Sequence, residues 1–254
     1  MNVIYLIIFF ILGTLMGSFF TVVGLRLPKN ENFIMGRSHC DSCGHELKLY
    51  EMIPIFSYLF QCGKCRYCKA KIGIMPLFME FFCGIFFLTA FFCFGFSYRL
   101  LIALGIVSLL MIIVVSDITY LIIPDEVLVF FGCYFLIIQI FASGWKGAIY
   151  HIITGLFLFV LIYIIMIFGN KLFKKESLGG GDIKLMFLFG LVLDPLLGSL
   201  SIFLGSLFAL PLSFYLLWKH NERIIPFGPF LLIALTFIYF TQITSGMVIS
   251  LLGF

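Results

Sequence analysis

Charged residues are scarce in this sequence: Asp, Glu, Lys and Arg make up 11% of its 254 residues, whereas 63% are hydrophobic. The mean hydropathy is +1.19. Soluble domains carry about 25% charged residues, so this composition excludes a soluble protein and predicts an all-α polytopic membrane protein. The net charge of +4 is therefore better explained by membrane topology than by nucleic-acid binding, and we expect no nucleic-acid partner.

The first apolar stretch has no basic residue before it. Its first cation is Arg26, on the far side of residues 2–25. A secretory signal peptide has the opposite polarity, with its positive charge in front of the apolar region. We therefore expect a retained first span whose N-terminus lies outside. No internal repeat or low-complexity tract is evident.

Eight apolar stretches are predicted to span the lipid bilayer. They cover residues 3–25, 76–94, 100–115, 127–141, 148–168, 182–194, 196–218 and 227–252. A polar loop separates the first two stretches. The expected organisation is a first transmembrane helix (1–28), a cytoplasmic loop (29–75) and a membrane domain of seven helices (76–254). Gly17, Ser18 and Gly24 are small residues that allow close helix packing in the first span.

The distribution of cations gives the orientation. If the polar loop is cytoplasmic, only Arg99 and Lys146 of the 16 Lys and Arg residues lie outside, which is a clear positive-inside bias. Asp117, Asp125 and Asp182 then lie at the cytoplasmic face. Asp194 lies outside, directly before Pro195, where an N-cap followed by proline is the expected structural role.

Five of the eight cysteines crowd into residues 40–68. Cys40 and Cys43 form one C-x2-C pair, and Cys65 and Cys68 form another, a pattern typical of a tetrahedral zinc site. A cytoplasmic loop disfavours disulfides, which strengthens this interpretation. Four protein ligands leave no open coordination position, so the predicted zinc is structural. Cys62 forms a competing C-x2-C pair with Cys65, and His39 and His45 are further alternative ligands.

The most unusual stretch is Gly179-Gly180-Gly181-Asp182, followed by Lys184. An ionisable residue at the edge of an apolar helix is expensive, so Asp182 is a functional hypothesis. The alternative is that Asp182 only caps the helix that follows. Lys184 either tunes Asp182 or anchors at the membrane interface by snorkelling.

A second acidic element supplies the partner for Asp182. An aspartyl hydrolase needs two carboxylates that share a proton. Asp125 follows Pro124 and precedes an apolar helix, so the N-cap role suits it best. Asp117 ends a helix, where the macrodipole disfavours an acid, and catalysis explains this placement. Glu80, one turn into the second span, is either a polar contact between helices or a partner for a positive group on a substrate.

Taken together, these motifs resemble those of the bacterial type IV prepilin peptidase family. Its members are intramembrane aspartyl proteases of the G-x-G-D type with N-methyltransferase activity. The resemblance covers nearly the whole chain. The matching elements are Gly17-Ser-Phe through Arg26-Leu-Pro28, Arg37-Ser-His-Cys40-Asp-Ser-Cys43, Ile53-Pro54 with Ser57, the Cys65–Cys68 pair with Ile72, Pro76 and Glu80, Asp117 with Ile123-Pro124-Asp125, Gly179-Gly-Gly181-Asp182, and Pro226-Phe-Gly-Pro-Phe230.

The resemblance implies that Asp117 and Asp182 cut the basic leader of prepilins or pseudopilins on the cytoplasmic side of the bacterial inner membrane. The new N-terminal amine is then methylated with S-adenosylmethionine. The resemblance also favours Cys68 over Cys62 as the zinc ligand. It implies supporting roles for Gly179, Gly180, Gly181, Lys184 and Asp125, and makes Glu80, Arg26 and Arg66 candidates for the substrate or methyl-donor site.

Three alternatives accompany this interpretation: a peptidase without methylation, a proton-coupled transporter, and a non-catalytic assembly factor. The first is kept open because no glycine-rich nucleotide loop follows a strand, as a familiar S-adenosylmethionine fold would require. A transporter would place acids near the bilayer midplane, whereas here the acids gather at one face.

Overall fold

The computed structural model describes residues 3–33, 38–40, 42–173, 179–220 and 225–251. Within these ranges the protein is helical, and the only β-pairing is two isolated bridges. The chain forms two compact units, Met1–Phe96 and Ser97–Phe254. Arg37 and Asp41 of the cysteine motif, and the cations Lys174, Lys175 and Arg223, lie outside the described residues.

The first unit is built on two apolar helices, α1 (Val3–Arg26) and α3 (Met75–Phe94), which pack together. Glycines make this approach close. A β-carbon on Gly17 would lie 2.7 Å from the carbonyl oxygen of Met79, and one on Gly13 would lie 2.6 Å from that of Cys83. This agrees with the packing role predicted for Gly17. In the structure α3 contacts α1 within the first unit, while the division into a loop and a membrane domain at residue 76 stays a prediction.

The polar loop between these helices carries little regular structure. It contains two 3-10 turns, η1 (Leu27–Lys29) and η2 (Leu49–Glu51), and one short helix, α2 (Phe56–Phe60). Many of its large apolar side chains are exposed, among them Leu49, Phe56, Leu59 and Phe60. A loop with so little apolar burial needs another source of stability.

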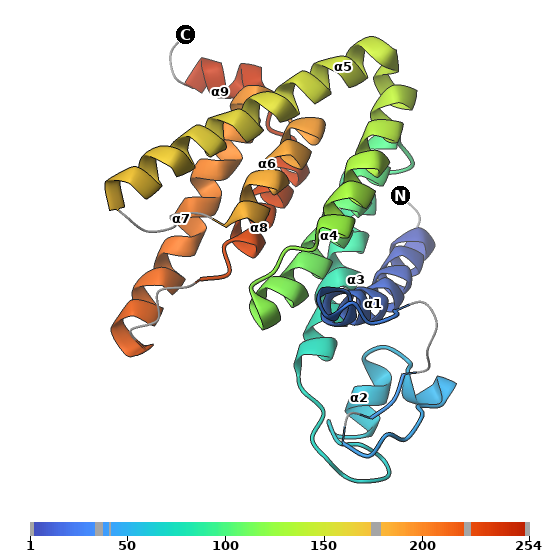
Figure 1. The fold of residues 1–254 in the computed structure, drawn as a ribbon. Coiled ribbons are helices and arrows are strands. Elements are labelled where there is room, and N and C mark those ends of the chain that lie inside the picture. The colour runs from blue at the N-terminus through green and yellow to red at the C-terminus, as the bar shows by residue number, and fades with distance from the viewer. Residues whose placement is uncertain (1–2, 34–37, 41, 174–178, 221–224, 252–254) are drawn as a thin grey trace. The chain divides into compact units, whose positions relative to one another are not determined.

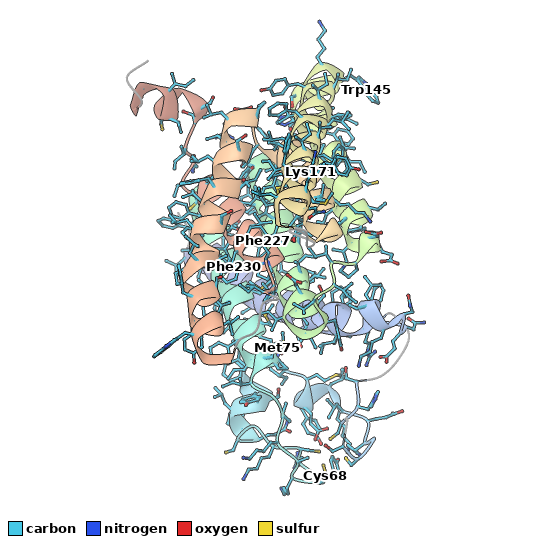
Figure 2. The ribbon with its side chains drawn as sticks, turned by 60° about the vertical axis from the view of Figure 1, so that its left-hand side comes forward. Cys68, Met75, Trp145, Lys171, Phe227 and Phe230 are labelled. Atoms are coloured by element: carbon cyan, nitrogen blue, oxygen red, sulfur yellow. The ribbon has the colours of Figure 1, made fainter. Side chains whose placement is uncertain are left out.

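The second unit begins with α4 (Tyr98–Tyr120), the most buried of the helices long enough to span a membrane, followed by α5 (Asp125–Phe173). Gly144 interrupts α5 with a φ of 70°, and the chain reverses there into a helical hairpin (Figure 1). The two limbs correspond to the stretches predicted over 127–141 and 148–168. Trp145 marks the tip of the hairpin (Figure 2), the kind of position at which tryptophan meets a membrane interface.

The hairpin packs on α6 (Gly180–Val192). Gly190 of α6 lies directly against Gly155 of the second limb, where a β-carbon on Gly190 would collide with the backbone of Gly155. The next helix, α7 (Pro195–His220), begins directly after Asp194, the position predicted for an N-cap with proline at the first helical residue.

The last predicted span, 227–252, is wrong as a single helix. It forms α8 (Gly228–Phe240) and α9 (Ser245–Leu251). Gln242 adopts a φ of 53°, which a right-handed helix cannot accommodate, so the apolar run is interrupted. Helix α8 packs against α4 and α7 and is largely buried.

Among the described residues, five helices are long and apolar enough to cross a membrane. They are α1 with its following turn, α3, α4, the interrupted α5, and α7. A span needs about 20 residues, so the 48 residues of α5 are long enough for two crossings when divided at Gly144. Helices α6 and α8 have 13 residues each. The structure therefore confirms a helical membrane protein, while the count of eight spans stays a prediction.

Candidate active site and metal centre

Asp117 lies in the last turn of α4 and is buried, with 6% of its surface exposed. Its Oδ2 accepts the backbone N–H of Gly228 at 3.1 Å. Gly228 is the first residue of α8, so this N–H is one of the donors that a helix start leaves free. The positive end of α8 therefore faces the carboxylate and offsets the unfavourable dipole at the end of α4.

Gly228 also makes room for this contact. A β-carbon on that residue would lie 3.1 Å from Oδ2 of Asp117 and the same distance from Ile123. Glycine thus lets the start of α8 approach the acid without a clash. The sequence analysis did not assign a role to Gly228, although it belongs to the Pro226–Phe230 motif that carried part of the resemblance.

Asp182 lies in the first turn of α6 and is also buried, with 8% of its surface exposed. It is not the N-cap of α6, because Gly179 holds that position. The Asp182 carboxylate instead reaches back to the backbone N–H of Gly179, as an acid at the third helical position commonly does. A β-carbon on Gly179 would lie 3.1 Å from Oδ2 of Asp182.

The two acids belong to one site. Gly181 packs against Ile123, where a β-carbon would lie 2.8 Å from that of the isoleucine, and Ile123 also meets Gly228 beside Asp117. The side chain of Ile123 therefore joins the turn that carries Asp182 to the helix start that holds Asp117. The charge of Asp117 acts on Asp182. Where the charge of one buried carboxylate disfavours ionisation of another, the two are suited to sharing one proton.

The four predicted cysteine ligands also come together. The sulfur atoms of Cys40, Cys43, Cys65 and Cys68 lie within 4.8 Å of one another, and those of Cys40 and Cys68 are 3.8 Å apart. A tetrahedral zinc ion with Zn–S bonds of about 2.3 Å places its sulfur ligands roughly 3.8 Å apart. All eight cysteines are free. The donor set and its spacing fit zinc.

Both cysteine pairs use the same turn. The N–H of Cys40 donates to the carbonyl of His45 and the N–H of Gly44 donates to that of Cys40, while Cys65, Ala70 and Lys69 repeat this pattern. Gly44 and Lys69 both have positive φ, at 69° and 60°. Each turn is closed by an isolated bridge, His39 with Glu46 and Lys64 with Lys71. Two equal turns thus present four thiols to one point.

The repeated turn shows which of the alternative ligands lie in the cysteine cluster. Cys68 belongs to the cluster, whereas Cys62 is exposed at a φ of 51° and is not part of it. Neither His39 nor His45 joins the group, and the His45 ring lies against Tyr67 with centroids 3.5 Å apart. Backbone N–H groups of Cys68 and Tyr67 lower the pKa of the Cys65 thiol to about 7, which favours the thiolate that binds metal.

Comparison with known proteins identifies the family. A model described as the bacterial peptidase A24 N-terminal domain matches residues 11–94, and one described as the type IV leader peptidase family matches residues 104–214. The chain is 35% identical over 188 residues to the prepilin leader peptidase/N-methyltransferase of Bacillus subtilis (strain 168), covering 73% of each chain. The chain belongs to the type IV leader peptidase family.

Other members of this family align over nearly their full length. The Vibrio cholerae protein of the same name is 30% identical over 262 residues, covering 95% of this chain and 98% of the relative. The Pseudomonas aeruginosa protein is 30% identical over 257 residues, covering 88% and 86%. No solved structure matches the chain. The two family models fall within the two compact units, one in each.

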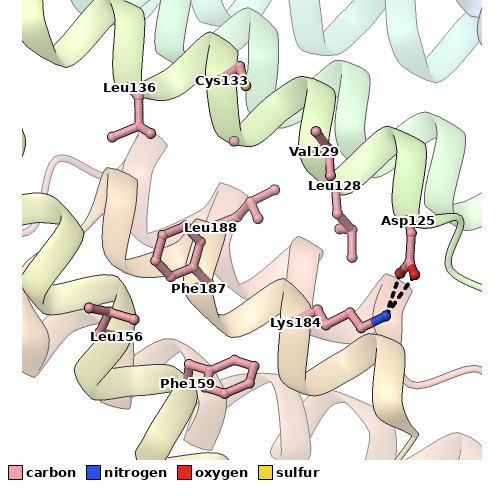
Figure 3. A pocket seen from close by; sticks show the side chains of 11 residues that line it. Asp125, Leu128, Val129, Cys133, Leu136, Leu156, Phe159, Lys184, Phe187 and Leu188 are labelled. Atoms are coloured by element: carbon pink, nitrogen blue, oxygen red, sulfur yellow. Dashed lines mark hydrogen bonds and ion pairs between the residues drawn. The ribbon is translucent and has the colours of Figure 1, made fainter.

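Asp125, the third aspartate predicted at the cytoplasmic face, has a different partner from the buried pair. Both of its carboxylate oxygens accept hydrogen bonds from Nζ of Lys184 at 2.7 Å (Figure 3). The side chains of Lys184 and Asp125 are 52% and 63% exposed. Lys184 therefore ties the start of α6 to the start of α5, a partner that the sequence analysis did not consider for it.

Asparagine at position 125 should be tolerated. An exposed ion pair contributes up to about 1 kcal/mol, so Asp125→Asn should slow prepilin cleavage by no more than about five-fold. Lys184→Met should have a similar effect, and the double variant should lose no more than either single one. Initial cleavage rates of purified variants test this. A loss as large as that of Asp117→Asn would place Asp125 in the catalytic pair.

Glu80 is held inside the first unit. It is 7% exposed, accepts the N–H of Ile55 at 2.7 Å and contacts the hydroxyl of Ser18. Ile55 has a φ of 64° and a ψ of −55°, and the N–H of Phe56 donates to the carbonyl of Pro54. This is a γ-turn, a strained conformation for a β-branched residue. Glu80 thus fastens a strained turn to α1 and α3.

Arg26 and Arg66 have partners of their own. The Arg26 guanidinium donates to the carbonyl of Asn32 at 3.3 Å, and the Arg66 guanidinium lies 5.5 Å from the centre of the Tyr50 ring. Neither of these contacts involves Glu80. A role for these three residues in binding the methyl donor stays a prediction.

Glu80→Gln should loosen the turn at Ile55. The neutral amide accepts a weaker hydrogen bond than a carboxylate, and a weakened bond at a buried, strained backbone costs about 1–3 kcal/mol. Hydrogen exchange of the peptide covering residues 53–57 should accelerate about ten-fold or more as a result. Glu31→Gln, in the exposed part of the same loop, is the matched control. Unchanged exchange in Glu80→Gln would show that the carboxylate does not hold the turn.

Proposed function

We propose that this protein cleaves the leader of type IV prepilins or pseudopilins at the cytoplasmic membrane face and then N-methylates the new N-terminus. The observation that carries the proposal is the buried pair of Asp117 and Asp182, formed by a helix end and a helix start around Ile123. The same pair lies in a chain of the type IV leader peptidase family.

The chemistry of cleavage follows from a shared proton. One carboxylate acts as the base and takes a proton from a water molecule, which attacks the scissile carbonyl carbon. The other carboxylic acid donates its proton to the carbonyl oxygen, which gives a tetrahedral intermediate. The intermediate collapses when the first carboxyl group returns its proton to the amide nitrogen, so the C–N bond breaks and the leader keeps the new carboxyl group while the pilin leaves with a free N-terminal amine. The N–H of Gly228 and the N–H of Gly179 orient the two carboxylates. Burial by the surrounding apolar side chains excludes bulk water from the site.

The proposed topology has eight crossings and an outside N-terminus in the bacterial inner membrane. The two limbs of α5 count as separate spans, and α6 and α8 are short spans within the bundle. The positive-inside bias supports a cytoplasmic cysteine loop. With that orientation, the ends of α4 and α6 that carry Asp117 and Asp182 face the cytoplasmic side, where a substrate's basic leader would lie.

The zinc ion is proposed to be structural, with Cys40, Cys43, Cys65 and Cys68 as its ligands. When bound, it supplies a cross-link between the two turns of the loop. The methyl donor is proposed to be S-adenosylmethionine, as the name of the relatives suggests. The described residues contain no strand–glycine–helix unit of the familiar nucleotide-binding kind, so no residue is assigned to the donor.

Mass spectrometry of a prepilin incubated with the purified enzyme tests both activities. We expect a product cut before its apolar helix, with one methyl group added only when S-adenosylmethionine is present. A cut product that never gains the methyl group would reduce the proposal to a peptidase. Prepilins and pseudopilins that all remain intact would overturn it in favour of a transport or assembly role.

A further inference from the structure

A cavity of about 360 Å³ lies beside Asp182 in the second unit. Its walls come from the second limb of α5, from α6, from α7 and from the start of α8. Residues from each wall are Ile162, Met186, Ile202, Phe203, Phe227 and Leu231. We call this cavity the Asp182 pocket. Figure 2 shows Phe227, its contribution from the segment that leads into α8.

The lining of the Asp182 pocket selects for an apolar occupant. Asp182 is its only ionisable group. Two serines also line it, but the hydroxyl of Ser199 donates to the carbonyl of Pro195 and that of Ser206 donates to the carbonyl of Ile202. Both hydroxyls are thus engaged by their own helix. A polar side chain placed here would lose its hydrogen bonds to water without gaining others.

The size of the pocket suits side chains rather than a whole helix. An apolar cavity of about 150 Å³ takes up a benzene ring, so this pocket has room for one large apolar side chain and part of a second. Its position matters more than its size. Because Asp182 forms part of the wall, whatever fills the pocket lies next to the acid that acts on the scissile bond.

We propose that the Asp182 pocket receives the apolar side chain on the carboxyl side of the scissile bond. This inference rests on the proposed function. A prepilin is basic before the cut and apolar after it, and only the second of these matches the lining. A leader cation in the pocket would be desolvated and would neutralise a carboxylate that must exchange protons. The pocket thereby sets which peptide bond reaches the two acids.

A second cavity provides an internal control. It has about 580 Å³, lies between the two limbs of α5 and α6, and has the Asp125–Lys184 pair at one end (Figure 3). Neither Asp117 nor Asp182 lines it. Its residues on α6, such as Lys184 and Leu188, lie on a different face from Asp182 and Met186. Filling this cavity should leave the position of the scissile bond unchanged.

The test fills each cavity with one phenylalanine ring. Ser206→Phe projects into the Asp182 pocket from an exposed position on α7. Gly132→Phe projects into the second cavity, where a β-carbon would meet nothing within 4 Å. We expect Ser206→Phe to lower kcat/KM for prepilin cleavage at least ten-fold, mainly through KM. Gly132→Phe should change it less than two-fold.

Substrate variants then identify which side chain occupies the pocket. Ser206→Phe should recover activity on a prepilin carrying alanine directly after the scissile bond. Ile202→Ala, which enlarges the pocket, should shift preference toward a larger residue there. The inference is overturned if the two phenylalanine variants behave alike, or if activity follows the residue before the cut instead. Failure of the wild-type enzyme to cleave any prepilin would overturn the proposed function itself, which is a separate outcome.

Discussion

Asp117→Asn and Asp182→Asn should each lower the rate of prepilin cleavage by about 10²- to 10⁴-fold, which is the usual contribution of a positioned proton-transfer group. Asparagine keeps the shape of the side chain and can still meet the N–H of Gly228 or of Gly179. It cannot exchange the proton that the mechanism needs. Single-turnover cleavage of a purified prepilin measures the loss, and the double variant should be hardly worse than either single one because the acids act as a unit.

Two other aspartates serve as controls for this experiment. Asp194 lies directly before α7, at the far end of α6 from Asp182, and its Oδ1 accepts the Tyr150 hydroxyl at 3.3 Å. Asp194→Asn should therefore cleave at nearly the wild-type rate, as should Asp125→Asn within the limit given above. If Asp117→Asn or Asp182→Asn kept more than about a tenth of the wild-type rate, the buried pair would not be the catalytic pair.

The sequence predicted the helices and the two acids because both depend on local patterns. Apolar runs of sufficient length predict spans, and an acid at the edge of such a run signals function whatever the rest of the chain does. The C-x2-C pairs are equally local, since one short turn repeated at Cys40 and Cys65 produces the cluster. For these features, the tertiary structure shows where the residues lie, whereas the sequence alone shows which residues they are.

The contacts that complete the site depend on segments far apart in the chain. Gly228 reaches Asp117 across 111 residues, and no spacing rule in the sequence predicts that α8 begins beside the end of α4. Lys184 shows the same limit. It is two residues from Asp182 in sequence but about 200° away around the helix, so it pairs with Asp125 instead. The sequence analysis left two roles open for Lys184, and neither of them included this ion pair.

Backbone conformation accounts for the other differences. The break between α8 and α9 occurs at Gln242, whose positive φ is not marked by glycine or proline. The strained turn at Ile55 is similarly hidden, since isoleucine is among the residues least expected at positive φ. The carboxylate of Glu80, 25 residues away, accepts the N–H of Ile55 and helps to hold this turn. At Ile55, a long-range polar contact thus stabilises a backbone conformation that the residue type disfavours.

The cysteine loop should lose its structure when its metal site is removed. Its exposed apolar side chains, such as Leu49, Phe56 and Phe60, show that it has little core of its own. Zinc binding in small domains contributes about 10–16 kcal/mol of folding free energy, which would supply the missing stability. Cys40→Ser should therefore lower bound zinc from near one equivalent to near none and increase proteolysis within residues 38–71.

Cys62→Ser is the matched control for this experiment, because Cys62 lies in the same loop and forms a C-x2-C pair with Cys65 but stays outside the cluster. It should retain its zinc and resist proteolysis like the wild type. Elemental analysis and limited proteolysis of both variants, with and without a zinc chelator, separate the two cysteines. Equal zinc loss in both would mean that Cys62 is a ligand. Full zinc in Cys40→Ser would mean that the loop is stabilised by its protein contacts alone.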